Sequence, residues 1–563
     1  MCGIWAYIVG KRYYDAERVR NAVDTLSARG PESLAIKHIR DVVLGFCRLA
    51  INDVSPSGMQ PMSHANLHWI CNGEIYNWKE LRNRLGLSCS SASDCSIIGP
   101  LWDHFKGDAS QFFRSLDGVF SLIIYDENKE QLIIGRDPYG VRPLFRATDS
   151  SGRTCFGSEM KSLVELCNNI ESFPPGHYSI YKANLDLQLT SQRYHTVPWV
   201  KNQMWSPAYE GGLQLACEAV RESLRLAVRK RLMTERPIAA LLSGGVDSSL
   251  ICALLQSELK RANGPTLKTF SIGFEGSPDL FHARLVANHI GSEHTEVVVT
   301  PQDFIDAIPD VIAAIESYDT TTVRASIGNW LVAREIRRRT ECKVVFNGDG
   351  SDEIFGSYLY FFRAPCDEAF ETETMRLLED IHCYDVLRSD RSISAHGLEP
   401  RTPFLDKQFV AVARAVSTQW RRPILSPSGN SADDKTSLSS NGYPIIEKWI
   451  LRKAFDGTNI LPNEVLWRQK EAFSDGVSNR SHAPWYSSVK CPVDDSVSSI
   501  TYLPPKTPEA RYYRKVFDDN YGGKCYTTIK YFWMPKWSGE TSDPSARTLS
   551  LYSSSGGGEP TTV

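Results

Sequence analysis

The stretch at residues 241–249, Leu-Leu-Ser-Gly-Gly-Val-Asp-Ser-Ser, constrains the fold of this chain more than any other part. It follows an apolar run at 238–240 and precedes an apolar-periodic segment at 250–259, so the pattern predicts a strand, a tight loop and a helix. The two glycines let the backbone approach a ligand closely, and hydroxyls and helix N-terminal amides face the same way. We expect this loop to hold the phosphates of a nucleotide; a turn that only joins strand to helix is the alternative.

Asp247 stands among these groups although a carboxylate repels phosphate, which implies a Mg²⁺ ion bridging the carboxylate and a pyrophosphate group. The pattern resembles the SGGxDS loop of ATP pyrophosphatases, which adenylate an acid and release pyrophosphate. It is not a Walker A loop, because no Gly-Lys-Ser/Thr follows. The loop residues expected to bind ATP and pyrophosphate are Leu242, Ser243, Gly244, Gly245, Asp247 and Ser248.

Strand and helix patterns alternate after this loop. Residues 267–274, 295–299 and 343–346 read as strands, with a helix at 279–290 and two helical stretches before the last strand; another helix is expected at 213–232. Alternation of this kind predicts a parallel, doubly wound sheet whose ligand lies at the carboxyl ends of its strands.

A second acidic loop, Phe-Asn-Gly-Asp-Gly-Ser-Asp-Glu at 346–353, follows the last of these strands. Glycines with clustered acids can form a plain turn or a Ca²⁺ loop. Together with the loop at 243–248, they instead suggest one shared Mg²⁺-pyrophosphate site. Asp352 is then the second acid on the metal side, beside Asp247.

Composition narrows the class of protein. A chain of 563 residues is too long for one core, so two or more domains are expected, and 42% hydrophobic with 23% charged residues is ordinary for globular proteins. A net charge of -3 gives no reason to expect nucleic acid or a membrane as partner, and no apolar run approaches the roughly 20 residues of a span. The 14 cysteines lack CxxC pairs, and the N-terminus lacks a basic leader, so we expect reduced thiols in a cytoplasmic protein.

Cys2 becomes the first residue once Met1 is removed, which places its thiol beside its own free amine. An α-amino group titrates near about 7.7 to 8.0 and a free thiol near about 8.5, so the amine can serve as the base for the thiol. The pair would form a nucleophile and base within one residue. Taken alone, a cysteine at position 2 is in most cases an incidental thiol.

Short motifs in a fixed order give Cys2 its context. They are Arg-Gly-Pro at 29–31, Gly-Phe-Cys-Arg-Leu at 45–49, Cys-Asn-Gly-Glu-Ile-Tyr-Asn at 71–77, Ser-Asp-Cys at 93–95, Leu-Asp-Gly at 116–118 and Gly-Arg-Asp-Pro-Tyr-Gly at 135–140, with paired strands expected at 120–125 and 131–134. This segment resembles the class II glutamine amidotransferase domain, an N-terminal-nucleophile fold. The resemblance implies an αββα sandwich, which we place at residues 1–205.

By that resemblance Cys2 attacks the side-chain amide of glutamine, and Asn72 with Gly73 lines the oxyanion hole. The glutamine site would comprise Arg48, Leu49, Asn72, Gly73, Glu74 and Asp94. A guanidinium grips a carboxylate with two prongs, and paired acids recognise an ammonium group. The chain departs from the family pattern at Ala28, Glu32 and Ser96, where histidine, aspartate and glutamate are common.

Later motifs extend the resemblance to about residue 552. They are Tyr-Asp-Thr-Thr-Thr-Val-Arg at 318–324, the segment 396–406, Trp-Arg-Gln-Lys-Glu-Ala-Phe at 467–473, Tyr-Phe-Trp-Met-Pro-Lys-Trp at 531–537 and Asp-Pro-Ser-Ala-Arg at 543–547. With these the chain resembles the glutamine-hydrolysing asparagine synthetases of eukaryotic type.

The resemblance assigns roles in the second domain, placed at 206–552 with a helical C-terminal part. Lys470 would neutralise phosphate charge, and Asp349, one methylene shorter than the usual glutamate, would deprotonate ammonia. The remaining assignments are ATP contacts by Ile272, Asn347 and Gly348, and an aspartate or adenylate pocket formed by Asp319, Thr321, Thr322 and Arg324. Residues 426–441 read as a flexible insertion and 553–563 as a disordered tail.

The implied reaction is carbon–nitrogen ligation with glutamine as the amido-nitrogen donor. Aspartate, glutamine and ATP would give asparagine, glutamate, AMP and pyrophosphate through a β-aspartyl-adenylate, with Mg²⁺ as cofactor and a homodimer as a family expectation. Two alternatives stay open: amidation of another carboxylate, or a weakly active homologue kept for regulation.

Overall fold

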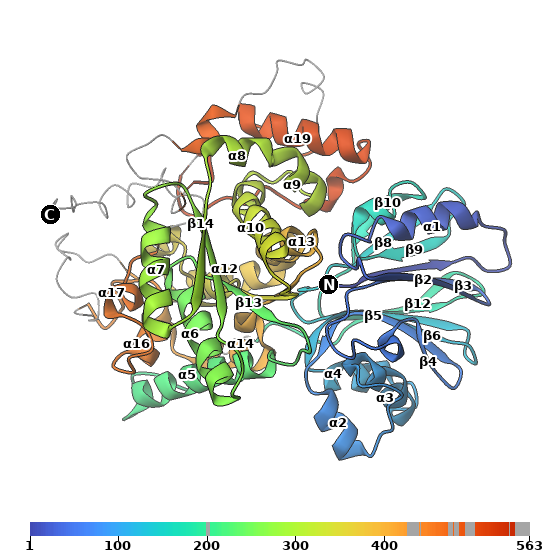
Figure 1. Ribbon diagram of the computed structural model, residues 1–563, viewed down its shortest axis with the longest axis horizontal. Helices are drawn as coiled ribbons and strands as arrows, with labels where there is room; N and C mark the ends of the chain where they lie inside the picture. Colours follow the sequence, from blue (N-terminus) through green and yellow to red (C-terminus); the bar gives the residue numbers. More distant parts are fainter. Residues whose placement is uncertain are drawn as a thin grey trace.

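The computed structural model describes residues 1–198, 203–424, 438–439, 441–470, 477, 484–489, 501–539 and 541–545. The chain forms two regions that lie side by side, an N-terminal one of antiparallel strands and a larger one built on a parallel sheet (Figure 1). Most of the predicted insertion at 426–441, namely 426–437 and 440, lies outside the described residues, as does the predicted tail at 553–563.

Two six-stranded antiparallel sheets form the N-terminal region. The first has the order β10-β8-β9-β1-β3-β2, with bounds Cys167–Ser172, Phe145–Asp149, Thr154–Gly157, Gly3–Ile8, Val42–Arg48 and Ser33–Ile39. The second has the order β12-β11-β7-β6-β5-β4, with bounds Leu187–Arg193, His177–Lys182, Gln131–Arg136, Gly118–Asp126, Leu67–Ile75 and Met62–His64. The strands predicted at 120–125 and 131–134 are β6 and β7, which pair as expected.

Alternation along the strands explains the layers. In β1, Ile4 and Ala6 face the core between the two sheets, whereas Trp5 and Tyr7 point to the opposite face, towards α1 (Ala16–Asp24). The outer face of the second sheet packs on α3 (Ile98–His104) and α4 (Ala109–Ser115), with α2 (Trp78–Leu85) beside them. The predicted αββα sandwich is confirmed.

The larger region contains a five-stranded parallel sheet of order β15-β14-β13-β16-β17. Its strands are Glu293–Val298, Lys268–Gly273, Ile238–Leu241, Val344–Phe346 and Glu399–Arg401. The chain leaves β13 towards β14 and later returns to β13's other side as β16, so the order reverses there. The prediction of a doubly wound parallel sheet is confirmed, and its switch point lies between the two glycine-rich loops.

Helices surround this sheet. The predicted helices at 213–232, 250–259 and 279–290 are α5 (Gly212–Lys230), α6 (Val246–Arg261) and α7 (Pro278–Ile290). Between β15 and β16 the structure has three helices rather than the two predicted: α8 (Pro301–Asp306), α9 (Ile308–Ile315) and α10 (Thr320–Arg339). Pro309, in the first turn of α9, lacks the amide that would continue α8, so one expected helix becomes two.

The C-terminal part is helical, as expected. Its helices are α11 (Ser351–Phe355), α12 (Asp367–Asp380), α13 (Asp385–Ser394), α14 (Lys407–Ala415), α15 (Thr418–Arg421), α16 (Trp449–Phe455), α17 (Asn463–Leu466) and α19 (Pro508–Tyr521). None of the described helices has the length and apolar character that crossing a membrane requires. The thirteen described cysteines are all free thiols, as their scattered spacing predicts.

Buried ion pairs join the two regions through α13. Arg29 of the N-terminal region donates to Glu159 at 2.7 Å and to Asp390 of α13 at 2.8 Å, and all three side chains are buried. Arg391, also on α13, pairs with Glu316. The interface therefore fixes α13 between the start of the chain and the larger region.

Candidate active sites

Cys2 lies at the entry to β1, partly buried, with its Sγ donating to the Leu49 carbonyl at 3.5 Å. The Arg29 guanidinium holds the Cys2 carbonyl through a hydrogen bond of 3.1 Å. Burial raises the pKa of the Cys2 thiol to about 11 and lowers the pKa of the Met1 amine to about 6.

Asn72 and Gly73 follow one another on β5, where they pair with Ser121 and Phe120 of β6. Asn72 is fully buried, yet neither amide atom of its side chain has a hydrogen-bond partner among the described residues. Gly73 has φ +152°, and a Cβ there would lie 2.0 Å from the Val119 carbonyl oxygen, so only glycine fits. Buried unpaired amide groups are rare and point to a ligand that completes them.

Glu74 and Asp94 form a pair of buried acids beside these residues. Asn52 donates to both carboxylates, and the Ile75 amide donates to Asp94 at 2.7 Å. Burial, the Asp94 charge and the Glu399 charge raise the pKa of Glu74 well above its ordinary value, and burial raises the pKa of Asp94 to about 6. Two acids held in this way suit a cationic ligand group.

Arg48, the residue expected to bind the α-carboxylate of glutamine, already donates hydrogen bonds to main-chain carbonyl groups. Its guanidinium donates to the Ser55 carbonyl at 2.9 Å and to the Asp53 carbonyl at 2.5 Å. Of the positions that depart from the family pattern, Glu32 pairs with Arg236 of the larger region at 2.9 Å, and the Ser96 hydroxyl donates to the Ser93 carbonyl at 2.6 Å.

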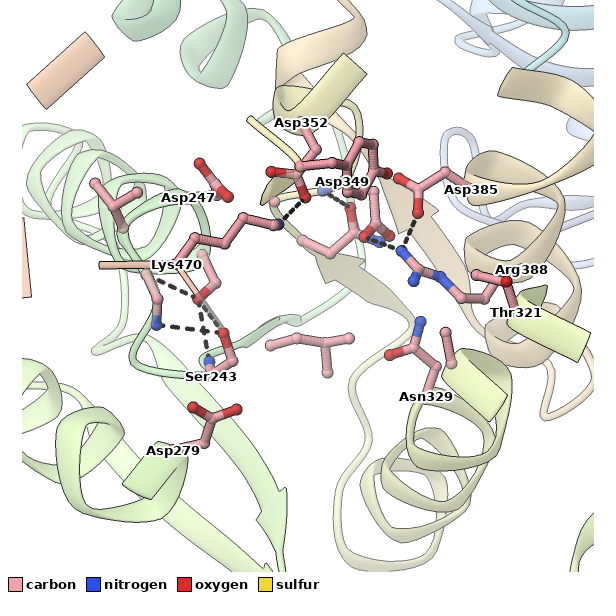
Figure 2. A pocket seen from close by; sticks show the side chains of 18 of the residues that line it. Ser243, Asp247, Asp279, Thr321, Asn329, Asp349, Asp352, Asp385, Arg388 and Lys470 are labelled. Atoms are coloured by element: carbon pink, nitrogen blue, oxygen red, sulfur yellow. Dashed lines mark hydrogen bonds and ion pairs between the residues drawn. The ribbon is translucent and has the colours of Figure 1, made fainter. Parts of the chain in front are cut away.

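The predicted phosphate loop connects β13 to α6. The Ser243 amide and the Ser243 hydroxyl both contact the Ser248 hydroxyl, at 3.1 Å and 2.9 Å, which closes the loop on itself. Gly244 has φ +73°, and a Cβ there would lie 2.6 Å from the Ala283 amide nitrogen, so the turn requires glycine. The loop faces a cavity of about 290 Å³ (Figure 2).

Two lysines join the two acids expected at the metal. Lys448 bridges Asp247 and Asp352, reaching the latter at 2.5 Å, and Lys470 contacts the other oxygen of Asp352 at 2.5 Å (Figure 2). Burial opposes ionisation of Asp352, but the two lysines outweigh it and hold its pKa below the ordinary value. Lys448 is 1% exposed and has φ +56°, a left-handed conformation that non-glycine residues adopt only under constraint.

The donor set here fits a nucleotide-bound Mg²⁺ ion. The described residues contain no cluster of three acids, histidines or cysteines that could hold a metal unaided. Mg²⁺ in nucleotide sites takes one or two carboxylates and completes its shell with phosphate oxygens and water. Asp247 and Asp352, which share Lys448 as a partner, are the two carboxylates that would meet this requirement.

Asp349 lines the same cavity and contacts α13. The Arg388 guanidinium contacts one Asp349 oxygen at 2.9 Å and also Asp385, while the other Asp349 oxygen has no partner among the described residues (Figure 2). Burial raises the pKa of Asp385 to about 6, against the opposing charge of Arg388. Glu353 lines the same cavity, and burial raises its pKa well above the ordinary value.

The residues expected at the acceptor acid lie at the start of α10. Asp319 is the N-cap of the helix and accepts from the Thr322 amide at 2.8 Å and from the Thr322 hydroxyl at 2.7 Å. Arg324 is paired with Glu509 and with Asp543, the latter at 2.8 Å. Their polar groups therefore already have protein partners.

Comparisons with known proteins cover the whole chain. The family model "Glutamine amidotransferase domain" matches residues 1–174, and the model "Asparagine synthase" matches 219–371 and 363–515. Proteins named "Asparagine synthetase [glutamine-hydrolyzing]" match from Cricetulus griseus at 40%, Homo sapiens at 39% and Gallus gallus at 38% identity, each over 98% of this chain and 99% of the relative. The chain belongs to the asparagine synthetase family.

In this member of the family, one cavity gathers most residues that the sequence pointed to. The expected residues among its lining are Leu242, Ser243, Gly245, Asp247, Ser248, Ile272, Thr321, Thr322, Arg324, Asn347, Gly348, Asp349, Asp352 and Lys470. Gly244 and Asp319 are not among the lining residues, because the first turns the loop and the second caps α10.

Sequence reasoning about this family member missed Lys448, Glu353, Asp385 and Arg388. The sequence did contain a signal for Lys448. Residues 444–451 read Pro-Ile-Ile-Glu-Lys-Trp-Ile-Leu, so Glu447 and Lys448 are two charged residues within an otherwise apolar run. Charges inside an otherwise apolar run are buried, and a buried lysine needs acidic partners. Asp385 and Arg388 carried no such signal, because an acid and a base three residues apart on a helix usually form a solvated pair.

Proposed function

We propose that this protein synthesises asparagine from aspartate, using ATP and the amide nitrogen of glutamine. The observation that carries the proposal is the assembly of Asp247, Asp352 and Lys470 around the phosphate loop of one cavity, in a chain of the asparagine synthetase family. A cytosolic location and a homodimer stay predictions.

The first half-reaction belongs to Cys2. Its thiol would attack the glutamine side-chain amide, with the free amine of a processed N-terminus taking the proton. The unpaired Asn72 amide and the Gly73 backbone suit the oxyanion that develops, and Glu74 with Asp94 suits the glutamine ammonium group. Arg48 is expected to take the α-carboxylate, which requires it to exchange a carbonyl partner for the ligand.

The second half-reaction activates aspartate. Ser243, Gly245, Ser248 and the α6 N-terminus would hold the departing pyrophosphate, and Leu242, Ile272, Asn347 and Gly348 would contact the rest of the nucleotide. Mg²⁺, held by Asp247 and Asp352, would supply charge neutralisation for pyrophosphate as the aspartate carboxylate attacks ATP. Lys470 lies beside the same acids and would add positive charge to the leaving group.

The last step joins ammonia to the activated acid. Asp349, with one oxygen unpaired in the cavity, is placed to accept the proton that the attacking nitrogen loses. Arg388 fixes its other oxygen and ties it to Asp385, which supports the shorter aspartate side chain at this position.

One incubation tests the proposal. The protein is given glutamine, aspartate, ATP and Mg²⁺, and asparagine, glutamate, AMP and pyrophosphate are quantified together. Asparagine forming in step with AMP and pyrophosphate is the expected result. Glutamate without asparagine or AMP would contradict the proposal and point to another acceptor acid or a regulatory role.

A further inference from the structure

Residues 531–539 and 541–545, here called the C-terminal wall, close one side of the nucleotide cavity. Trp533, Pro535, Pro544 and Ser545 are among the residues that line it. The Trp533 ring packs edge-on against Tyr358 at 5.2 Å between centroids, and the Lys470 ammonium lies 5.2 Å from the centre of that same Tyr358 ring. The wall thus contacts the aromatic side chain that backs Lys470.

The start of α10 holds the wall by its backbone. The Trp533 amide donates to Asp319 Oδ1 at 2.8 Å, and the Thr321 hydroxyl donates to the Trp533 carbonyl at 3.3 Å. Asp319 is fully buried, and its other oxygen accepts from the Thr322 amide. Both backbone groups of Trp533 are therefore fixed by the helix on which the family's acceptor-site residues lie.

Arg324 holds the far end of the wall. Its guanidinium donates to Asp543 at 2.8 Å and to the two oxygens of Glu509 at 2.8 and 2.5 Å, and it stacks 3.5 Å from the Tyr486 ring centre. Two carboxylates already balance its charge, and the residue is 5% exposed. A guanidinium bound in this way has little left with which to grip a substrate carboxylate.

We propose that the C-terminal wall completes the pocket for the acceptor acid, with Trp533 as its facing side chain, and that Asp319 and Arg324 are positioning residues that hold this wall. The inference rests on the proposed function, since the acid is taken to be aspartate. A fixed wall keeps water from the adenylate, whose attack by water returns aspartate and AMP. A loosened wall weakens aspartate binding and releases AMP without asparagine.

The variant Asp543→Asn distinguishes a role of the C-terminal wall in aspartate binding from a direct contact between Arg324 and the substrate. The substitution removes the charge that ties the wall but leaves Arg324 and its Glu509 partner intact. If Arg324 gripped the substrate, freeing its second prong would preserve or improve aspartate binding. The wall predicts the opposite: the KM for aspartate rises about tenfold, the scale by which a hydrogen bond to a charged acceptor exceeds one to a neutral amide, and AMP exceeds asparagine. The glutaminase rate stays unchanged.

Hydrogen exchange of 531–539 in the substrate-free protein supplies the second readout. Asp543→Asn and Asp319→Ala should speed exchange there, whereas Arg338→Gln, which removes an exposed ion pair of the same α10, should not. Trp533→Ala should raise the KM for aspartate and Trp533→Phe should restore most of it.

Two results would overturn the inference. Activity lost without faster exchange would mean that Asp319 and Arg324 act on the substrate directly, and faster exchange with unchanged aspartate kinetics would mean that the wall is not part of the pocket. If the wild-type protein makes no asparagine, the proposed function fails, while the exchange comparison still decides whether Asp319 and Asp543 hold the wall.

Discussion

The two candidate sites differ in whether their buried polar and charged groups are paired with one another. In the N-terminal region the Asn72 amide has no partner among the described residues, and the acids Glu74 and Asp94 have raised pKa values. In the nucleotide cavity Asp247, Lys448, Asp352 and Lys470 neutralise one another in a continuous chain of ion pairs.

This difference follows from what each site is proposed to bind. A zwitterion such as glutamine brings as much positive as negative charge, so its site can stay partly unpaired without accumulating net charge. A nucleotide brings several negative charges with its metal, so a site built for it must balance its own lysines while empty. The first site then needs only Arg48 to release a carbonyl partner, whereas the second must open its ion pairs on binding.

The prediction with the largest expected effect is that the reaction of one site can be abolished while the reaction of the other continues. Cys2→Ala removes the only nucleophile proposed for glutamine, so glutamine-dependent synthesis should fall by about 10⁴-fold or more, the scale at which covalent catalysis is lost. Synthesis with added ammonium should survive, because Cys2 is not among the described residues that line the nucleotide cavity. If both activities disappear together, the assignment of one chemistry to each site is wrong.

Lys448→Met tests the closed network of the second site. It leaves Asp247 and one oxygen of Asp352 without their cation, and breaking a buried pair in this way costs about 3–5 kcal/mol. Synthesis should fall by about 10³-fold with either nitrogen source, while glutamate release at Cys2 continues. Lys453→Met, which removes the half-buried lysine of α16 that pairs with Asp456, serves as the control. Full activity of the Lys448 variant would show that the network is not needed.

Sequence reasoning reached the fold because apolar periodicity is local. The strand before the 243–248 loop, the helix after it and the paired strands β6 and β7 follow directly from which residues must be buried. The one miscounted helix came from Pro309, whose effect depends on the chain bending between α8 and α9. Motif resemblance then supplied the residues that are expected to contact ligands.

The residues that sequence reasoning missed act through distant partners. Lys448 can be assigned a role only once β13 and β16 bring its partners Asp247 and Asp352 together. Arg388 can be assigned one only once α13 lies against Asp349. Neither contact is periodic or close in the chain. Arg324 shows the reverse case: its motif was visible, but its pairing with Glu509 and Asp543 depends on the C-terminal wall.

Asn72→Leu tests whether the unpaired amide group of the N-terminal site serves catalysis and not stability. Because neither amide atom of Asn72 has a partner, replacing it by a leucine of similar size should leave the free energy of unfolding nearly unchanged. The rate of glutamate release should still fall by about 10²-fold, through loss of an oxyanion donor. Denaturant unfolding and glutaminase kinetics measured on the same preparation check both halves. A large loss of stability would mean that the amide has a structural role.

The smallest expected effect is a pH dependence confined to the glutamine site. Asp94, with its pKa raised to about 6 by burial, loses its charge as the pH falls through that value, so the KM for glutamine should rise about tenfold per pH unit below 6. Stability should change in the opposite sense. The folded state takes up this proton more readily than the unfolded chain, so the ionised carboxylate opposes folding, fully above about pH 6 and not below about pH 4.

Asp94→Asn should therefore stabilise the protein at neutral pH while it weakens glutamine binding, and its KM should lose the part of the pH dependence that Asp94 causes around pH 6. Glutamate release measured between about pH 5 and 8 for both proteins, with unfolding curves at the same values, decides the matter. A wild-type KM that stays constant across this range would mean that Asp94 does not carry the charge that recognises glutamine. The contrast between a site with unpaired groups and a site of paired charges would then rest on Asn72 alone.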